Sequence, residues 1–227
     1  MCEDAKRTTP PNQVPVVRKA TVSDLENTVS VHVASFSGFF LTSLGRKFLF
    51  EVYRGFLESD SGIYLISALD GSQIGFVVGT MDPGGHFKQL LYRRWYRFIL
   101  AGLPALLRHP IMVGRKFLGA VLYRGEKPAG IENSVLLSSL AVSPATNGKG
   151  VGRALVESFC KEAESRGASS VYLLTDRDDN EPVNQFYGKC GFRLESSFGR
   201  QSRRIMNRYV RIIAPRNNGH TTTGTSS

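Results

Sequence analysis

The sequence lacks the features that mark disulfide-stabilised, zinc-binding and membrane-spanning proteins. It holds three cysteines, Cys2, Cys160 and Cys190, and their odd number and scattered positions predict neither a disulfide framework nor a zinc site. We expect Cys160 and Cys190 to be packed as small hydrophobic residues. No apolar stretch reaches the roughly 18 residues that a membrane-spanning helix needs. The polar N-terminus has no apolar core of the kind that a signal peptide carries. These absences predict a soluble or peripheral protein in a reducing compartment, either cytoplasmic or at the inner face of the membrane.

Acidic residues are scarce in one segment of the chain. The whole chain has 29 Lys and Arg against 19 Asp and Glu, a net charge of +10. Residues 84–130 hold nine basic residues and one acid, Glu126, so this segment alone carries +8. Apolar residues recur in it at helical spacing, namely Phe87, Leu90, Leu91, Trp95, Phe98 and Ile99. Two interpretations stay open: a helical subdomain packed on the sheet with a solvated basic face, or a basic amphipathic helix that meets anionic lipid or an anionic substrate. A nucleic-acid partner is not expected, because no recognised binding module accompanies the charge.

A length of 227 residues is enough for one domain with a full hydrophobic core. We expect this domain to span residues 16–213, with the basic segment 84–130 as a helical insertion. Residues 1–15 are polar and rich in proline, which predicts a flexible lead-in. Residues 214–227 lack an apolar anchor, which predicts a disordered tail.

Turn residues and hydrophobic periodicity predict the elements on either side of the insertion. Asp70-Gly71 stands between two apolar runs and strongly favours a hairpin. We expect His32 to be an ordinary residue on a helix face, and at least two of Phe36, Phe39 and Phe40 to lie in the core. The predicted elements are a strand at Val16–Ala20, a helix from Asp24 to Val33 capped by Thr21 or Ser23, an apolar turn at Phe36–Leu44, a helix at Arg46–Leu57, strands at Gly62–Leu69 and Gln73–Thr80, and a closing hairpin at Arg193–Ile213.

The most informative stretch runs from Leu136 to Gly167. A short apolar run ends at Val142, and because both faces of the run are apolar it predicts a central strand. A glycine-rich turn and an amphipathic helix follow, and Gly167 ends that helix. Such a turn presents the unpaired N–H groups and positive dipole end of the helix to an anion, and phosphate is the usual occupant. A tight turn that binds no ligand is the other interpretation of the glycines taken alone.

Three phosphate-binding patterns compete for this turn. A P-loop needs Gly-Lys-Ser/Thr, and Gly152-Arg153-Ala154 does not supply it. A dinucleotide fingerprint needs a third glycine where Arg153 stands. The segment Asn147-Gly-Lys-Gly-Val-Gly152 resembles the acyl-CoA turn of the GNAT N-acetyltransferase superfamily at both of its required glycines, although Asn147 departs from the usual Gln or Arg.

A second motif downstream strengthens this resemblance. The strand predicted at Val171–Thr175 is followed by Asn180, by Tyr187 seven residues later, and then by Gly191-Phe192. This order is similar to the later motif of the same superfamily. The two motifs together imply an α/β (mixed α+β) protein with the three-layer acyl-CoA N-acyltransferase fold. In that fold a mostly antiparallel mixed sheet has helices on both faces, here with a helical insertion before the central strand.

The resemblance further implies acetyl-CoA as the acetyl donor. The residues that it marks for binding this donor are Leu140, Ala141, Val142, Asn147, Gly148, Lys149, Gly150, Val151, Gly152, Arg153, Asn180 and Tyr187. The turn would hold the pyrophosphate, and the strand would pair with the pantetheine arm and place an N–H opposite the thioester oxygen. Tyr187 matches the general acid that protonates the leaving thiolate; the alternative is a tyrosine that only packs in the core.

No carboxylate stands on the central strand, where many relatives carry a glutamate, so the general base stays open between Asp176, Asp178 and a water relay, with Glu132 placed early for this role. No metal is expected, because Glu181 and Tyr187 replace the Gly and Glu that a calcium loop starting at Asp176 would need.

The function predicted is transfer of an acetyl group to a primary amine by direct attack on the thioester. The acceptor is open between an amino sugar, a small amine and a protein amine, and a homodimer is also left open. The alternative, motivated by the missing carboxylate, is a non-catalytic protein that binds acyl-CoA as a sensor.

Overall fold

The computed structural model describes residues 14–108, 133–146, 148–199 and 205–213. Several sequence predictions therefore lie outside the described residues: most of the N-terminal lead-in, the C-terminal tail, the second half of the insertion, Glu132 and Asn147.

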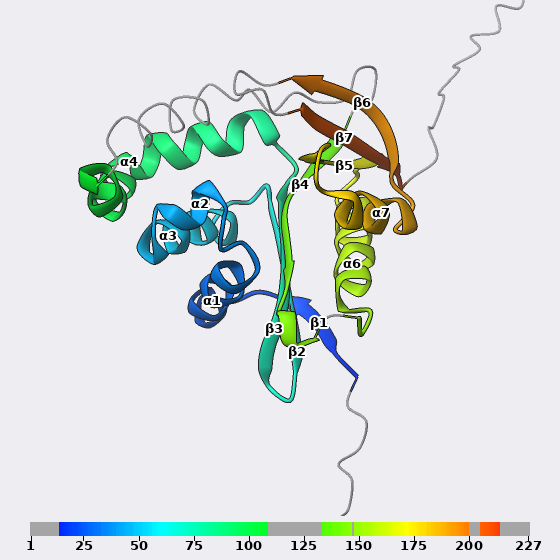
Figure 1. Ribbon diagram of the computed structural model, residues 1–227, viewed down its shortest axis with the longest axis horizontal. Coiled ribbons are helices and arrows are strands. Elements are labelled where there is room, and N and C mark those ends of the chain that lie inside the picture. Colours follow the sequence, from blue (N-terminus) through cyan, green and yellow to red (C-terminus); the bar gives the residue numbers. More distant parts are fainter. Residues whose placement is uncertain (1–13, 109–132, 147, 200–204, 214–227) are drawn as a thin grey trace, which may run out of the picture.

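The described chain forms a seven-stranded sheet with the order β1-β2-β3-β4-β5-β7-β6 (Figure 1). Among the described strands, β4 and β5 form the one parallel pair, and the other neighbours are antiparallel. The strands are β1 (Val16–Lys19), β2 (Gly62–Leu69), β3 (Ser72–Thr80), β4 (Ser134–Val142), β5 (Ser170–Asp176), β6 (Arg193–Gly199) and β7 (Ile205–Ile212). The helices are η1 (Val22–Asp24), α1 (Leu25–Ser35), α2 (Phe40–Ser43), α3 (Arg46–Leu57), α4 (Pro83–Arg108), η2 (Pro144–Thr146), α6 (Val151–Ser165) and α7 (Glu181–Lys189). The predicted mixed, mostly antiparallel sheet is confirmed.

Local sequence accounts for the boundaries of the first half. Asp70 and Gly71 both have positive φ, 51° and 73°, as a two-residue hairpin turn with the twist of its strands requires. Thr21 and Asp24 form a capping box at the start of η1. Asp24 also accepts two hydrogen bonds from Arg18, at 2.7 and 2.8 Å, which with the Thr21 contacts lower the pKa of its carboxyl to about 2.

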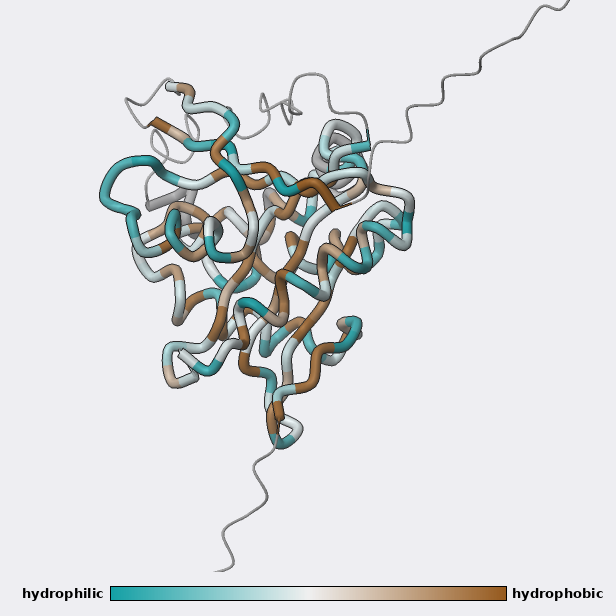
Figure 2. The backbone as a smooth tube through the Cα atoms, turned by 90° about the vertical axis from the view of Figure 1, so that its right-hand side faces the viewer, coloured by the Kyte–Doolittle hydropathy of each residue, from teal (hydrophilic) through white to brown (hydrophobic). Residues whose placement is uncertain are grey.

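Helices lie on both faces of the sheet (Figure 1), and each face carries a hydrophobic layer. Helices α6 and α7 cover one face, where Leu155 and Phe159 pack against strand residues such as Val77 and Val171. Helices α1 and α3 cover the other face around Tyr53. Figure 2 shows the hydrophobic residues following the strands and the hydrophilic residues following the outer turns.

A β-bulge in the central strand changes which side of the sheet its residues face. The register of β3 against β4 shifts between the pairs Val78–Ser139 and Gly79–Leu137, which leaves Ser138 as the extra residue. Leu137 belongs to the α6 layer, whereas Ala141 belongs to the layer of α1 and α3. The bulge thus shifts the alternation of β4, so that Ala141 faces α1 and α3 while Leu140 and Val142 pack on the α6 side.

Two predictions about apolar residues need correction. The segment Phe36–Leu44 is not only a turn, because it contains the short helix α2. Phe36 and Phe40 are half-buried against the hydrophobic clusters, as expected of two of the three phenylalanines, but Phe39 is exposed. Trp95, predicted on the apolar stripe of the insertion together with Phe98, is 60% exposed, because α4 packs through its Phe98 side onto α3.

Candidate active site

The site begins where β4 and β5 separate. Their parallel pairing extends only over Ser134–Leu136 and Ser170–Tyr172, while β4 continues to Val142 and β5 to Asp176. From Leu137 onward β4 has β3 on one side and, among the described residues, no strand on the other. An unpaired strand edge inside a sheet offers main-chain donors and acceptors to an extended ligand.

The direction of the backbone groups on this edge follows from one hydrogen bond. Ser143 N–H donates to Ile74 C=O at 2.7 Å, so position 143 faces β3. Backbone groups alternate in direction along a strand. The N–H and C=O groups of Val142 and Leu140 therefore point away from β3 and toward the open edge. The Val142 carbonyl there accepts from Ser35 Oγ at 3.1 Å. Of the three strand residues predicted to bind the donor, Leu140 and Val142 therefore face the site with their main chain, and Ala141 faces β3.

The turn that follows β4 has the backbone of an anion site. Gly148 and Gly150 have φ of +81° and +76°, a region that side chains rarely adopt. Gly150 is the N-cap of α6, and within the described residues no side chain caps this helix. The N–H groups of its first turn, starting at Val151, therefore have no partner within the helix. Lys149 and Arg153 are exposed beside them. This arrangement fits a pyrophosphate. Asn147, the first residue of the predicted turn, lies outside the described residues.

Gly152 is needed for packing, a role that sequence reasoning missed. A Cβ on Gly152 would lie 3.3 Å from the ring of Phe186 and 3.7 Å from Val142 Cγ2. Absence of a side chain thus lets α7 approach the first turn of α6. The sequence offers one indication that Phe186 lies at the site: it directly precedes Tyr187, in the helix that contains the second motif.

Tyr187 is buried beside this contact. It is 8% exposed, and its ring packs edge-on against Phe186 and Phe192 at centroid distances of 5.1 and 5.7 Å. Burial raises the pKa of its hydroxyl, because the phenolate would be poorly solvated there. Tyr187 consequently keeps its proton at neutral pH, as a proton donor must. The residue packs in the core, as one interpretation of the sequence has it, and its protonated hydroxyl is compatible with the predicted role as general acid, which stays a prediction.

Asn180 and Asn184 fix α7 to the end of β5. Asn180 occupies the N-cap position of α7, but its side chain does not cap the helix; it donates to the Asp176 carbonyl at 3.2 Å. Thr175 Oγ1 donates to Asn184 Oδ1 at 2.6 Å, and Asn184 Nδ2 donates to the same Asp176 carbonyl at 3.2 Å. These bonds set the position of Tyr187. Sequence reasoning did not identify Asn184.

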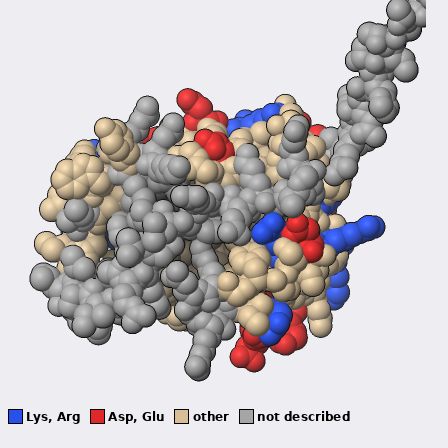
Figure 3. Space-filling model, turned by 90° about the horizontal axis from the view of Figure 1, so that it is seen from above, with Lys and Arg blue, Asp and Glu red and all other residues tan. Residues whose placement is uncertain are grey.

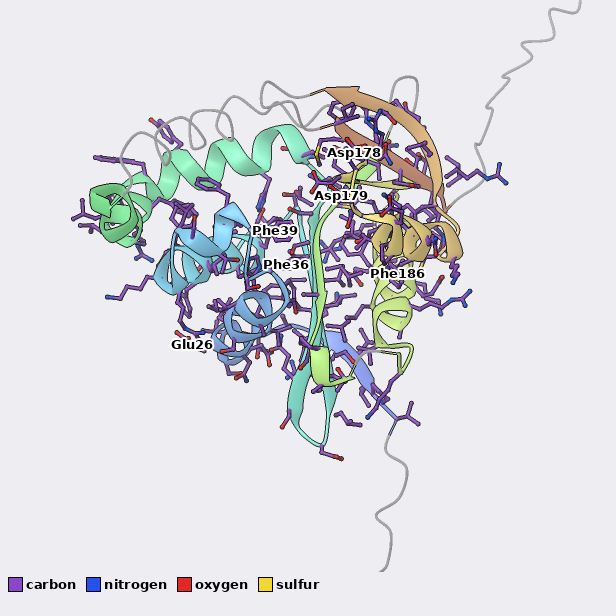
Figure 4. All side chains as sticks on the ribbon, viewed as in Figure 1. Glu26, Phe36, Phe39, Asp178, Asp179 and Phe186 are labelled. Atoms are coloured by element: carbon purple, nitrogen blue, oxygen red, sulfur yellow. The ribbon has the colours of Figure 1, made fainter. Side chains whose placement is uncertain are left out.

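The two candidate bases differ in their surroundings. Asp178 forms an ion pair with Arg177 at 2.7 Å and is exposed. Asp176 is half-buried at the end of β5. Figure 4 shows Asp178 and Asp179 at this end of the sheet, and Phe36 and Phe39 on the side of β4 opposite to Phe186.

His32 was expected to be an ordinary helix-face residue, and the structure corrects this. It is buried, and its Nδ1 lies 2.5 Å from the Tyr53 hydroxyl, which also hydrogen bonds Ser139 on β4. Burial lowers the pKa of His32 to about 4. The imidazole is therefore neutral at pH 7, and the three side chains connect α1, α3 and the bulged half of β4.

Both described cysteines are buried, as predicted, and unpaired. Burial raises the pKa of Cys160 to about 12 and also raises that of Cys190. Neither of these two thiols is activated as a nucleophile, so neither described cysteine supports transfer through a covalent intermediate.

Comparison with known proteins identifies the family. Residues 29–192 match the family described as Acetyltransferase (GNAT) family. This match covers more than half of the chain and includes β4, the glycine turn and α7. The chain belongs to the GNAT family. GNAT acetyltransferases use acetyl-CoA, which is the donor that the motifs imply. No protein of curated function matches the sequence.

Solved GNAT structures share the fold. The ribosomal-protein-S18-alanine N-acetyltransferase from Escherichia coli is 13% identical, with a TM-score of 0.55 over 90% of this chain and 98% of the other. Aminoglycoside 6'-acetyltransferase type Ii is 14% identical, with a TM-score of 0.58 over 88% and 99%. The PaiA N-acetyltransferase from Thermoplasma acidophilum, solved in complex with coenzyme A, is 17% identical, with a TM-score of 0.51 over 86% and 98%. At these identities the likeness is one of fold.

Proposed function

We propose that this GNAT protein transfers an acetyl group from acetyl-CoA to a primary amine. The observation that carries the proposal is the convergence of three features at one edge of the sheet: the open main chain at Leu140 and Val142, the uncapped turn at Gly148–Gly152, and the buried Tyr187. A protein that only binds phosphate needs the turn, but it does not need the other two features.

Each feature has a place in the reaction. The turn holds the pyrophosphate through backbone N–H groups and the positive end of α6. The open edge of β4 pairs with the pantetheine arm and aims an N–H at the thioester oxygen, where negative charge develops as the amine attacks the carbonyl carbon. The carbon–sulfur bond then breaks, Tyr187 gives its proton to the departing thiolate, and the resulting phenolate regains a proton from solvent water.

The attacking nitrogen loses one proton when the amide forms, and we assign this proton to water. His32 and Tyr53 form a buried polar pair on the α1 side of β4, but they do not act as the base. A pKa of about 4 for His32 makes its imidazole a weak acceptor at neutral pH. Asp178 is already paired with Arg177. Since we assign no base among the described residues, we expect the enzyme to work best on amines that are partly neutral at its working pH.

The acceptor side of the site favours an amino sugar or a small amine with a flat apolar face. Phe39 is 51% exposed and packs edge-on against Phe36 at 5.2 Å between ring centroids. Both rings come from the segment between α1 and α3, across β4 from Phe186 (Figure 4). An exposed, supported aromatic ring is a surface on which the apolar face of a sugar ring can stack.

Acetyl-CoA turnover with a panel of amines tests the proposal against a non-catalytic sensor. The panel contains amino sugars, aliphatic diamines and peptides with free N-termini, and free CoA thiol is measured with and without each amine. We expect amine-dependent CoA release with at least one amino sugar, and a Phe39→Ala variant with a raised KM for it. Binding of acetyl-CoA without amine-dependent release from any member would favour the sensor.

A further inference from the structure

Helix α4 has two apolar sides, and only one of them is covered by protein in the described structure. On the inner side, Phe98 is 4% exposed and its ring lies 5.1 Å from that of Phe48 on α3. Gly102, one turn later, also faces Phe48. The outer side presents a set of large apolar residues to the surface: Tyr92 (87% exposed), Trp95 (60%), Tyr96 (47%), Leu100 (67%) and Leu103 (40%). We call these five residues the outer face of α4.

The spacing of the outer face makes it continuous. Its members recur at intervals of three and four residues, so they lie along one side of the helix. A single exposed hydrophobic residue is common, whereas a contiguous exposed apolar strip marks a surface that meets a partner. Trp and Tyr are the residues that gather where hydrocarbon meets polar headgroups, since each has an apolar ring and a polar atom.

Charge indicates the kind of partner. The sequence of α4 contains no Asp or Glu but has Lys88, Arg93, Arg94, Arg97 and Arg108. A helix that faces only water is stabilised by charges of both signs, and like charges on one helix repel each other. Acidic and basic side chains are indeed interspersed on the α6–α7 side of the molecule (Figure 3). The charged residues of α4 are all positive, so the helix is complementary to a negative surface.

The groove beside α4 is not the surface that would attract an anion. It lies between α4 and α3 and is lined by Arg97, Leu100, Arg46 and Lys47 together with Glu26 and Glu51. Arg97 pairs with Glu51 at 3.7 Å and Arg46 with Glu26 at 3.5 Å. Its cations are therefore largely balanced by acids, and the groove adds little attraction for an anion.

We propose that α4 is an interfacial helix, which lies on an anionic lipid surface with its outer face in the headgroup region. A helix in this position buries aromatic rings and leucines at the boundary while its basic residues meet the lipid phosphates. Within the described residues no helix is long and apolar enough to cross a membrane. The proposal does not depend on the catalytic assignment.

The position of α4 in the fold orients the enzyme on the membrane. Helix α4 packs on α3, in the layer that covers the sheet face opposite to α6 (Figure 1). The proposed contact therefore lies on the α3 side of the sheet, opposite to the face that α6 covers.

Trp95 provides the test, because it is the only tryptophan of the chain and it lies on the outer face. The full chain is titrated with vesicles of phosphatidylcholine alone and of phosphatidylcholine mixed with phosphatidylglycerol, and the emission of Trp95 is recorded. We expect a blue shift and quenching by brominated lipid with the anionic vesicles only, reversed by salt. Replacing Tyr92 and Leu100 by Ser should abolish binding, whereas Val22→Ser, which removes an equally exposed apolar residue on η1, should not.

Removing charge tests the electrostatic part. Each basic residue near an anionic surface raises the partition coefficient onto that surface about fivefold. The double change Arg93→Gln, Arg94→Gln should therefore lower the partition coefficient by roughly 30-fold. Acetyl-CoA affinity should stay unchanged in all of these variants, which separates a lost membrane contact from a lost fold.

The proposal is overturned by an unchanged Trp95 emission with anionic vesicles at low salt, by equal binding to neutral vesicles, or by full binding of the Tyr92 and Leu100 variant. A Trp95 response to a polynucleotide or to protein concentration, with none to lipid, would assign the face to a nucleic acid or to a second copy and would also overturn it.

Discussion

The phosphate turn allows a matched pair of substitutions at Gly150 that separates backbone strain from charge. Gly150 is exposed, its φ is +76°, and nothing lies within 4 Å of the position of an added Cβ. Gln and Glu side chains would therefore both fit without a clash, and both would share the cost of the left-handed backbone, about 1–2 kcal/mol. The two variants should unfold at similar denaturant concentrations, somewhat below the wild-type protein.

Only the Glu variant places a negative charge beside the proposed pyrophosphate. Two unit charges about 4 Å apart repel by about 1 kcal/mol in water and about 4 kcal/mol near a protein surface. Because the turn is exposed, we expect the lower part of this range, which corresponds to an acetyl-CoA Kd about 5- to 30-fold higher for Gly150→Glu than for Gly150→Gln.

Isothermal titration calorimetry at low and high salt measures this difference. Screening shortens the range of the repulsion to about 3 Å at 1 M salt, so the gap between the two variants should narrow there. Equal Kd values for Gln and Glu at low salt would show that the pyrophosphate binds elsewhere. A gap between the two Kd values that does not respond to salt would contradict the electrostatic reasoning.

Three further predictions concern the acid, the packing and the pH response. Tyr187→Phe should lower kcat by about 10²–10⁴-fold and leave the acetyl-CoA Kd nearly intact; an unchanged kcat in the folded variant would remove Tyr187 from the mechanism. Gly79→Ala should destabilise the fold by about 3 kcal/mol or more, because its Cβ would lie 2.4 Å from Phe159 Cζ and against the Leu136 carbonyl; a denaturant midpoint equal to that of wild type would refute the packing described. His32 and His86 have pKa values lowered by burial to about 4, so the unfolded chain binds more protons and stability should fall as pH drops from about 6.5 toward 4, by up to about 1.4 kcal/mol per pH unit for each proton. In a His32→Gln variant the free energy of unfolding should fall less steeply with decreasing pH. An equally steep fall would assign the pH response to other groups.

Much of the fold followed from local signals. The hairpin at Asp70-Gly71, the strand at Leu136–Val142 and the helix that ends before Gly167 depend on turn chemistry and periodicity, and these act over a few residues. All three are present. The order of the two motifs indicated the family because their separation is set by one strand and one helix.

Contacts between distant residues could not be predicted in this way. Gly152 contacts Phe186, and Tyr53 joins His32 to Ser139, only after the sheet has formed and the bulge has shifted the alternation of residues along β4. Asn184 lies on the same helix as Asn180, but nothing in its spacing indicates that it bonds Thr175. The exposure of Trp95 was also missed, because a helical repeat shows which residues share a side and not which side the rest of the protein covers.

A crystal structure of the wild-type protein with acetyl-CoA is the most direct test of the proposed site. We predict that the pyrophosphate accepts N–H groups of the Gly148–Gly152 turn, that the pantetheine arm pairs with the main chain of Leu140 and Val142, and that the thioester sulfur lies within hydrogen-bond reach of the Tyr187 hydroxyl. A pyrophosphate bound away from the α6 turn, or a sulfur facing away from Tyr187 across the splayed strands, would contradict the account.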